Sequence, residues 1–490
     1  MSLDNNTLLL PSSERLLRGL RSALAEMDTS GRADLQHAAR SMDVVLSHLL
    51  LRQALEPYPA IYAELLALVH EGERYQPAGS AAALPSTLTL EAGFDRVQAQ
   101  IGQALARICD LLQLASARNG ADDQDYVRRA QAAELRFYAA NYRPVPASAS
   151  DAPPPMTRET FESYLLERFP CRYKGLIKFQ RLVGGFQKET ILVDAELGSG
   201  EIEAMVIRAE KHDRFVKFTA SEITHEYEIV DQVWQHGVTV AEPLWLEADA
   251  ARLGRRFMVS RRAVGRNTGD ATGNSAKFPS ELTRSLIETL ARIHRLPMDG
   301  ALARTRLGHW LQWPKMADNT REEIRGWRQQ IWMNRAPPSP AFTRLFDWLD
   351  ANVPQDDEPI CVIHNDYGPH NILVDGNRVS AVLDWEVPRV GDPAEDLSFF
   401  IQCCGDAIDR EEALQIYRES TGHTISEFRL RYFDVLSIGK VLLSGLSAST
   451  MFQATDPALL DWCQMPVLWF GMYQPQVEAR IAAAEAARGR

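Results

Sequence analysis

The sequence lacks any excess of positive charge. Its 490 residues contain 65 aspartates and glutamates against 53 lysines and arginines, which gives a formal net charge of −12 at pH 7. A nucleic-acid-binding protein usually presents a basic surface, so we expect no nucleic-acid partner. The acidic balance is compatible with a cationic substrate and equally compatible with plain solubility.

The sequence also lacks the patterns of a zinc site. It contains six cysteines, and none of them forms a CxxC pair or has the His/Cys spacing that is typical of zinc ligands. Cys403 and Cys404 are adjacent inside an apolar run, which favours buried thiols. We therefore expect a protein from a reducing compartment.

Export and membrane signals are missing as well. The first residues, MSLDNNTLLLPSSERLL, contain no basic region followed by an apolar stretch, so no signal peptide is expected. No apolar run approaches the roughly 20 residues that a membrane-spanning helix needs. These absences predict a cytoplasmic protein with no membrane partner, and they leave its oligomeric state open.

The first part of the chain, residues 1–143, is predicted to be an all-helical N-terminal domain, because its apolar residues recur at helical spacing. The predicted helices cover residues 16–27, 42–50, 101–112 and 124–140. The stretch RPVPASASDAPPP follows. Its prolines remove hydrogen-bond donors and stiffen the chain, so it predicts a semi-rigid Pro/Ala-rich linker at 144–156.

After the linker the periodicity changes from helical to strand-like. The stretch GLIKFQRLVGGFQKETILVDAELGSGEIEAMVIRAE alternates apolar strand-like runs with glycine turns. A helical stretch, TASEITHEYEIVDQVWQHG, follows it, and two further strands are expected around 241–247 and 256–260. Residues 157–264 are therefore predicted to form a small β-rich lobe. Helices dominate again in 265–490, so we expect an α+β fold with a large helical lobe.

One stretch of the large lobe, IHNDYGPHNILVDGNRVSAVLDWE, places polar residues around two short apolar runs. Asp375-Gly376-Asn377 is a strong hairpin turn between these runs. Because a hairpin returns the chain to its starting end, Asn371 and Asp384 are expected to lie side by side. Both offer the hard oxygen ligands that magnesium prefers, so the sequence predicts that they bind Mg²⁺.

Asp366 lies five residues before Asn371, on the loop that enters this hairpin. It can therefore sit near the metal pair without belonging to it. A base for a substrate hydroxyl would be needed at that place. We predict that Asp366 is the catalytic residue.

The spacing H-x-D-x-x-x-x-N, followed by a hairpin and an aspartate, resembles the catalytic loop of protein-kinase-like enzymes. The words HNDYGPHNILV, VLDWE and GDPAEDLSFF resemble the aminoglycoside phosphotransferase and choline kinase-like family, over about 157–450. The tail IYRESTGHTISEFRLRYFDVLSIGKVLL is similar to a subgroup that includes kinase-like domains fused to acyl-CoA dehydrogenases. The resemblance implies a bilobal protein-kinase-like fold and the cofactors ATP and Mg²⁺.

The resemblance also implies where the nucleotide would bind. Arg208 ends an apolar strand at the position where the family places a Lys or Arg, and Glu226 matches the family's EY word. We expect the two to pair at the nucleotide site, with an ordinary surface ion pair as the alternative. Gly184 and Gly185 would form the loop over the phosphates, although the full GxGxxG pattern is absent. RRFMVSRRAVG would be the hinge that binds adenine.

Two residues depart from the family pattern. Asn365 stands at the usual glycine of H-G-D, and asparagine is the non-glycine residue best able to take unusual backbone angles. His370 stands before Asn371, where glycine is common. The resemblance implies structural rather than catalytic roles for His294, His364, Asp392 and Asp396.

The expected function is ATP- and Mg²⁺-dependent phosphorylation of a small-molecule hydroxyl, with a hydroxyacyl-CoA as the favoured acceptor. One alternative acceptor is an aminoglycoside or an amino alcohol. The alternative from another class is a catalytically weak, kinase-like protein that binds nucleotides and interacts with a partner. The N-terminal helical domain would either help to bind the acceptor or mediate oligomerisation.

Overall fold

The structure, a computed structural model, describes residues 58–76, 84–88, 94–116, 118, 121–139, 156–182, 188–210, 222–269, 276–333, 339–355, 360–454 and 472–488. The chain divides into two compact units. Unit 1 comprises residues 1–150, 324–352 and 438–483, and unit 2 comprises residues 151–323, 353–437 and 484–490.

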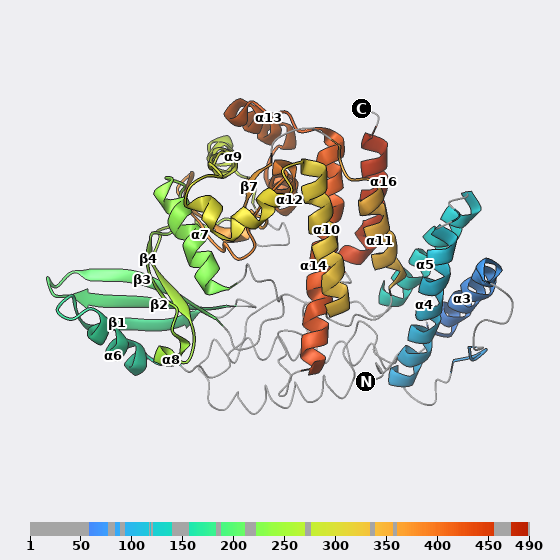
Figure 1. Ribbon diagram of the computed structural model, residues 1–490, viewed down its shortest axis with the longest axis horizontal. Helices are drawn as coiled ribbons and strands as arrows, with labels where there is room; N and C mark the ends of the chain where they lie inside the picture. The colour runs from blue at the N-terminus through green and yellow to red at the C-terminus, as the bar shows by residue number, and fades with distance from the viewer. Residues whose placement is uncertain are drawn as a thin grey trace. The chain divides into compact units, whose positions relative to one another are not determined.

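Unit 2 contains a five-stranded antiparallel sheet (Figure 1). Its strands lie in the order β1 (Tyr173–Leu182), β2 (Lys188–Leu197), β3 (Ile202–Glu210), β5 (Phe257–Arg261) and β4 (Pro243–Glu247). Side chains alternate between the faces of a strand, and the odd-numbered residues from Ile191 to Ala195 on β2 are fully buried. They share a core with Phe161 and Leu165 of α6 (Arg158–Arg168). The strands predicted for the small lobe are confirmed.

A single longer helix, α7 (Ile223–Gln235), lies on the other face of the sheet from α6 and the short α8 (Ala250–Leu253) (Figure 1). Its apolar residues Ile229 and Val233 are buried, and so is Glu226. The helix predicted within the small lobe is therefore confirmed. It presents a buried carboxylate to the even-numbered side chains of β2 and β3.

The predicted hairpin is present. β8 (Ile372–Asp375) and β9 (Arg378–Val382) are antiparallel, and Gly376 in the turn has a φ of +59°, which glycine adopts at little cost. The hairpin is anchored to α9 (Ser280–His294), because the Val379 N–H donates to Ser285 Oγ at 3.0 Å. β6 (Arg266–Asn267) extends it to a three-stranded sheet.

Unit 2 also contains a second small sheet and several further helices. The strand β7 pairs with β10, and α9 packs against α13. The further elements of unit 2 are η4 (Leu302–Arg304), η5 (Arg306–Gln312), β7 (Cys361–Ile363), η6 (Pro369–Asn371), β10 (Arg389–Gly391), α12 (Pro393–Cys404), η7 (Gly405–Ala407) and α13 (Arg410–Thr421).

In unit 1, three helices pack against one another: α3 (Tyr58–Gly72), α4 (Phe94–Ser116) and α5 (Ala121–Ala139) (Figure 1). A short turn, η1 (Glu73–Tyr75), follows α3. α4 and α5 confirm the predicted helices at 101–112 and 124–140. The helices predicted at 16–27 and 42–50 lie outside the described residues.

Unit 1 also takes segments from the second half of the chain. α10 (Met316–Met333) enters it at Ile324, and α14 (Glu427–Ala454) enters it at Ile438. It further contains α11 (Pro340–Ala351), η8 (Gln474–Gln476) and most of α16 (Val477–Ala487). The linker predicted at 144–156 lies outside the described residues except for Met156, so the predicted domain boundaries stay a prediction.

Glu134 of α5 connects the N-terminal helices to α11. Its fully buried carboxylate accepts hydrogen bonds from Ser339 Oγ at 2.8 Å and from the Ala341 N–H at 2.7 Å. These donors lie at the first turn of α11, where a negative charge is favoured by the helix dipole. Burial nevertheless raises the pKa of Glu134 to about 7. Within the described segments, no helix has the length and apolar character to span a membrane.

Candidate active site

The hairpin brings the two predicted magnesium ligands to one end of the β8–β9 pair. Ile372 pairs with Val382, and the Leu383 N–H donates to the Asn371 carbonyl at 2.7 Å. Asp384 follows directly, with a φ of +61°. A non-glycine residue adopts this left-handed conformation only at a cost, and such residues cluster at functional sites.

Asp366 lies beside Asn371, as predicted. The Asn371 Nδ2 group donates to Asp366 Oδ2 at 2.7 Å and to the Asp366 carbonyl at 3.1 Å. The second carboxylate oxygen, Oδ1, lies 3.4 Å from His370 Nε2. The side chain of Asp366 is 35% exposed, so a small molecule can reach it.

A buried carboxylate on α12 fixes the loop that carries Asp366. Asp396 accepts the N–H of His364 at 2.7 Å and the N–H of Asn365 at 2.6 Å. Asn365 has a φ of +67°, so it takes the left-handed conformation for which asparagine is suited. This is how the loop accommodates a residue other than glycine at this position.

The other histidines and aspartates with expected structural roles behave accordingly. His364 Nε2 lies 2.9 Å from the Leu383 carbonyl and ties the loop to the end of the hairpin. His294 Nε2 lies 3.2 Å from Asp396 Oδ2. Asp392 caps α12 by accepting the Ala394 N–H at 2.8 Å.

The predicted pair of Arg208 and Glu226 is present on the inner face of the sheet. Arg208 Nε lies 3.3 Å from Glu226 Oε1. The same guanidinium donates through Nη2 to Asp384 Oδ1 at 2.8 Å and to Glu386 Oε1 at 2.9 Å. Arg208 therefore links the strand β3 and the helix α7 to the end of the hairpin.

Sequence reasoning missed a second cation, Lys188. It is the first residue of β2, and only 2% of its side chain is exposed. Its ammonium group donates to Glu226 and lies 3.4 Å from Glu386 Oε1. Strand alternation could have pointed to it. Thr190 pairs with Arg208 and Lys188 pairs with Glu210, so Lys188 lies on the same face of the sheet as Arg208.

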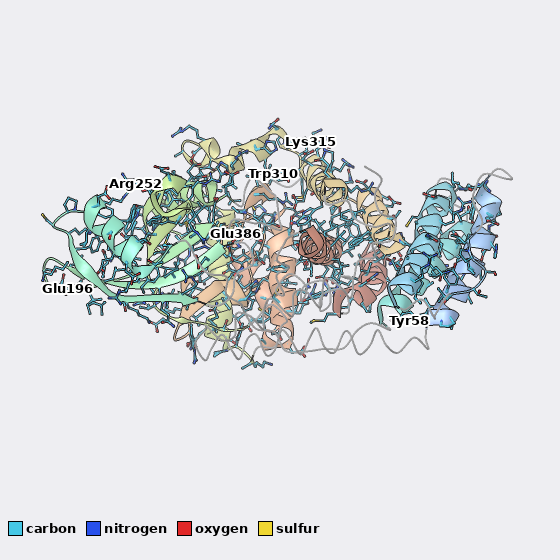
Figure 2. The ribbon with its side chains drawn as sticks, turned by 90° about the horizontal axis from the view of Figure 1, so that it is seen from below. Tyr58, Glu196, Arg252, Trp310, Lys315 and Glu386 are labelled. Carbon is cyan, nitrogen blue, oxygen red and sulfur yellow. The ribbon has the colours of Figure 1, made fainter. Side chains whose placement is uncertain are left out.

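Glu386 completes this group and was not predicted as a site residue either. Figure 2 shows it at the end of the sheet opposite to Glu196. Glu386 contacts both Lys188 and Arg208. We call Lys188, Arg208, Glu226, Asp384 and Glu386 the ionic cluster.

Charges within the ionic cluster set the protonation of its carboxylates. Burial raises the pKa of Glu386, and the neighbouring charge of Asp384 raises it further, to about 8. Burial would also raise the pKa of Asp384, but Arg208 and Lys188 outweigh it and lower that pKa below its usual value. Glu386 therefore holds its proton to a higher pH than Asp384 does.

The remaining predicted residues have no described position. Gly184 and Gly185 lie between β1 and β2, outside the residues that the structure describes. In the described part of the chain, no group of three or more His, Cys, Asp or Glu side chains forms a metal site. Asn371 and Asp384 supply one amide and one carboxylate oxygen. This donor set fits magnesium, which commonly takes only one or two protein ligands beside phosphates and water.

Parts of the chain are similar to known proteins. Residues 195–431 match the phosphotransferase enzyme family. The chain is 28% identical over 258 residues to acyl-CoA dehydrogenase family member 11 of Rattus norvegicus. The aligned segment covers 50% of this chain and 32% of that protein. The chain is 29% identical over 185 residues to the Homo sapiens protein of that name, covering 37% of this chain and 23% of the relative.

A solved structure shows the same fold. It belongs to a Ralstonia eutropha JMP134 protein assigned to the aminoglycoside phosphotransferases, and it covers 68% of this chain and 99% of its own, with 20% identity and a TM-score of 0.51. The expected family resemblance and the kinase-like α+β fold are thus confirmed. The aligned segments span at most about a third of the length of these curated relatives.

Proposed function

Residues 195–431 match the phosphotransferase enzyme family, and from this premise we propose that the protein transfers the γ-phosphoryl group of ATP to a hydroxyl of a small molecule. One observation carries the proposal. Asp366, Asn371 and Asp384 meet at one end of a hairpin, and Arg208 reaches the same point from the sheet. An acceptor, a metal ion and a phosphate would each find suitable side chains there.

Asp366 would orient the acceptor hydroxyl and accept its proton. Its carboxylate is exposed on one side and held on the other by Asn371. Phosphoryl transfer depends mainly on positioning and on charge stabilisation. A fixed carboxylate beside the metal ligands meets the first requirement.

Asn371 and Asp384 would hold Mg²⁺. The bound metal would neutralise charge that develops on the transferring phosphate. Asp384 is paired with Arg208 in this structure. Binding of Mg-ATP would therefore replace a carboxylate–guanidinium contact by carboxylate–metal and guanidinium–phosphate contacts, which leaves every charge partnered.

Arg208 would bind the phosphates, and Glu226 would hold it in place. A guanidinium offers a planar fork suited to phosphate oxygens. Lys188 adds a second charge beside the same carboxylate. It follows Gly184 and Gly185 closely in the sequence, and these two glycines would cover the phosphates. We propose that these residues together form the nucleotide site and that the protein works in the cytoplasm.

The favoured acceptor is a hydroxyacyl-CoA. The supporting observation is the similarity to acyl-CoA dehydrogenase family member 11, together with the sequence resemblance to kinase-like domains fused to acyl-CoA dehydrogenases. Phosphorylation turns an unactivated alcohol into a leaving group for later elimination. An aminoglycoside or an amino alcohol is the alternative acceptor.

The test is a turnover assay of the purified full-length protein with ATP and MgCl₂. 4-Hydroxypentanoyl-CoA, kanamycin and choline would be offered separately, and ADP release and the mass of the phosphorylated product would be measured. We expect phosphorylation of the hydroxyacyl-CoA and none in Asp384→Ala. Nucleotide binding without transfer to any acceptor would instead favour a binding protein.

A further inference from the structure

His370 occupies a place beside Asp366 that the proposed mechanism has not used. The 3₁₀ turn η6 puts it four residues after Asp366, with Nε2 at 3.4 Å from Asp366 Oδ1. Its ring lies edge-on to Phe399 of α12, with the ring centroids 6.2 Å apart. The Asn267 side chain on β6 donates to its carbonyl at 2.6 Å. The backbone and the ring of His370 are therefore both held.

Gly368 provides the space for this ring. A Cβ atom at position 368 would lie 2.5 Å from His370 Cε1 and 2.7 Å from His370 Nδ1. Gly368 has an extended backbone, with φ −135° and ψ 161°, which any residue can adopt. Its lack of a side chain is thus required by the imidazole and not by the backbone angles.

We propose that His370 is a positioning residue for Asp366. Asn371 Nδ2 holds one carboxylate oxygen at 2.7 Å, and His370 Nε2 lies against the other. With a contact to each oxygen, the carboxylate plane is fixed toward the acceptor. The inference rests on the proposed function, in which Asp366 orients the hydroxyl. It assigns His370 no contact with the substrate.

The first test compares His370→Ala with His370→Gln, because the glutamine Nε2 can take the place of the imidazole Nε2. Two reactions would be measured. One is the phosphorylation of 4-hydroxypentanoyl-CoA, and the other is ATP hydrolysis without this acceptor, in which water takes its place. We expect His370→Ala to lower kcat for both by about 10-fold to 100-fold, as misplacement of a reacting group does. The KM for ATP and the affinity for Mg-ADP should not change. His370→Gln should recover most of the loss.

The second test uses Gly368→Ala, which adds a methyl group against the ring and should displace it from Asp366. This variant should reproduce the loss in His370→Ala. Combined with His370→Ala, it should add nothing, because the obstructed ring is then gone. His423→Ala, at an exposed histidine, serves as the control and should keep the wild-type kcat.

The inference would be overturned by a wild-type kcat in His370→Ala, by equal losses in the alanine and glutamine variants, or by additive losses in the double variant. Melting curves of all variants would show that they are folded, and a loss of kcat that follows a loss of folded protein would also count against it. If the wild type binds Mg-ATP but phosphorylates no hydroxyl and hydrolyses no ATP, the proposed function fails before His370 is tested.

Discussion

At the scale of single residues, the site depends on which charges can reach one another. Lys188 and Arg208 come from neighbouring strands, and Glu226 on α7 contacts both. Buried charges are costly unless they are paired. The ionic cluster satisfies this condition with two cations facing three carboxyl groups, and burial raises the pKa of one of them, Glu386, to about 8.

Asp366→Asn tests the assignment of the base. The amide cannot accept the hydroxyl proton, so we expect kcat to fall by about 10²-fold to 10⁴-fold. The affinity for Mg-ATP, measured by calorimetry, should stay near that of the wild type. An equal loss of nucleotide affinity would mean that Asp366 binds nucleotide or metal instead.

Lys188→Met tests the cation that the sequence did not reveal. Removing it leaves Glu226 with Arg208 as its remaining partner, so we expect a loss of about 1–3 kcal/mol in the free energy of unfolding. The KM for ATP should rise by about 10-fold if the ammonium also contacts phosphate. Chemical denaturation and steady-state kinetics measure the two effects.

Lys174→Met is the matched control for this variant. Lys174 lies on β1 and pairs with Glu196 at 3.0 Å, but both side chains are exposed, by 51% and 42%. Exposed ion pairs contribute at most about 1 kcal/mol. If both lysine variants behave alike, Lys188 has no special role in the site.

At the scale of elements, helix ends and hairpins decide which side chains meet. Asp392 and Ser339 cap α12 and α11, and the β8–β9 hairpin aligns Asn371 with Asp384. Glu134 is the unusual case, because a carboxylate from one helix supports the first turn of another. Its contribution depends on pH.

The pKa of Glu134 is raised by burial from 4.5 to about 7. The folded state therefore binds a proton more tightly than the unfolded state, so stability falls as the pH rises from about 4.5 to about 7 and changes little above that. The shift corresponds to about 3 kcal/mol. Glu134→Gln stays neutral, and the difference in unfolding free energy between it and the wild type should change by about this amount across that window.

Urea unfolding at pH 5 and pH 8 would measure this difference. Asp110→Asn, at an exposed carboxylate on α4, is the control and should follow the wild type at both pH values. A constant difference between Glu134→Gln and the wild type would show that Glu134 does not titrate in this window.

At the scale of the whole chain, the first 150 residues do not form a compact unit of their own. They are grouped with residues 324–352 and 438–483. α11 packs against α4 and α5, and its buried side chains include Phe342 and Leu345. This grouping bears on both expectations for the N-terminal helices, because part of the large lobe needs them as packing partners.

Deletion of residues 1–150 should therefore expose the apolar side of α11 and leave the Ser339 and Ala341 donors without Glu134. We expect a truncated chain that is aggregation-prone or melts at least about 10 °C lower, and that recovers when residues 1–150 are co-expressed. Each 1 kcal/mol moves the melting temperature of a large domain by a few degrees. A soluble truncated chain with wild-type melting and a changed size in gel filtration would instead favour oligomerisation.

The sequence alone determined the parts of the site that are close along the chain. Asp366, Asn371 and Asp384 lie within 19 residues, and a two-stranded hairpin with a glycine turn leaves little freedom in how they meet. The periodicity also determined the strands of the sheet and the helices α4, α5 and α7. These features depend on local backbone geometry, which the residues specify directly.

Only the tertiary structure decided the contacts between distant segments. The sheet and α7 bring Lys188 and Arg208 to Glu386, and η6 turns His370 onto Asp366. Neither contact follows from periodicity, because the partner of a side chain depends on how the elements pack and on which charged groups become buried beside one another. The same reason places α11 with the N-terminal helices, because an apolar helix face shows that it must be covered but not by which segment.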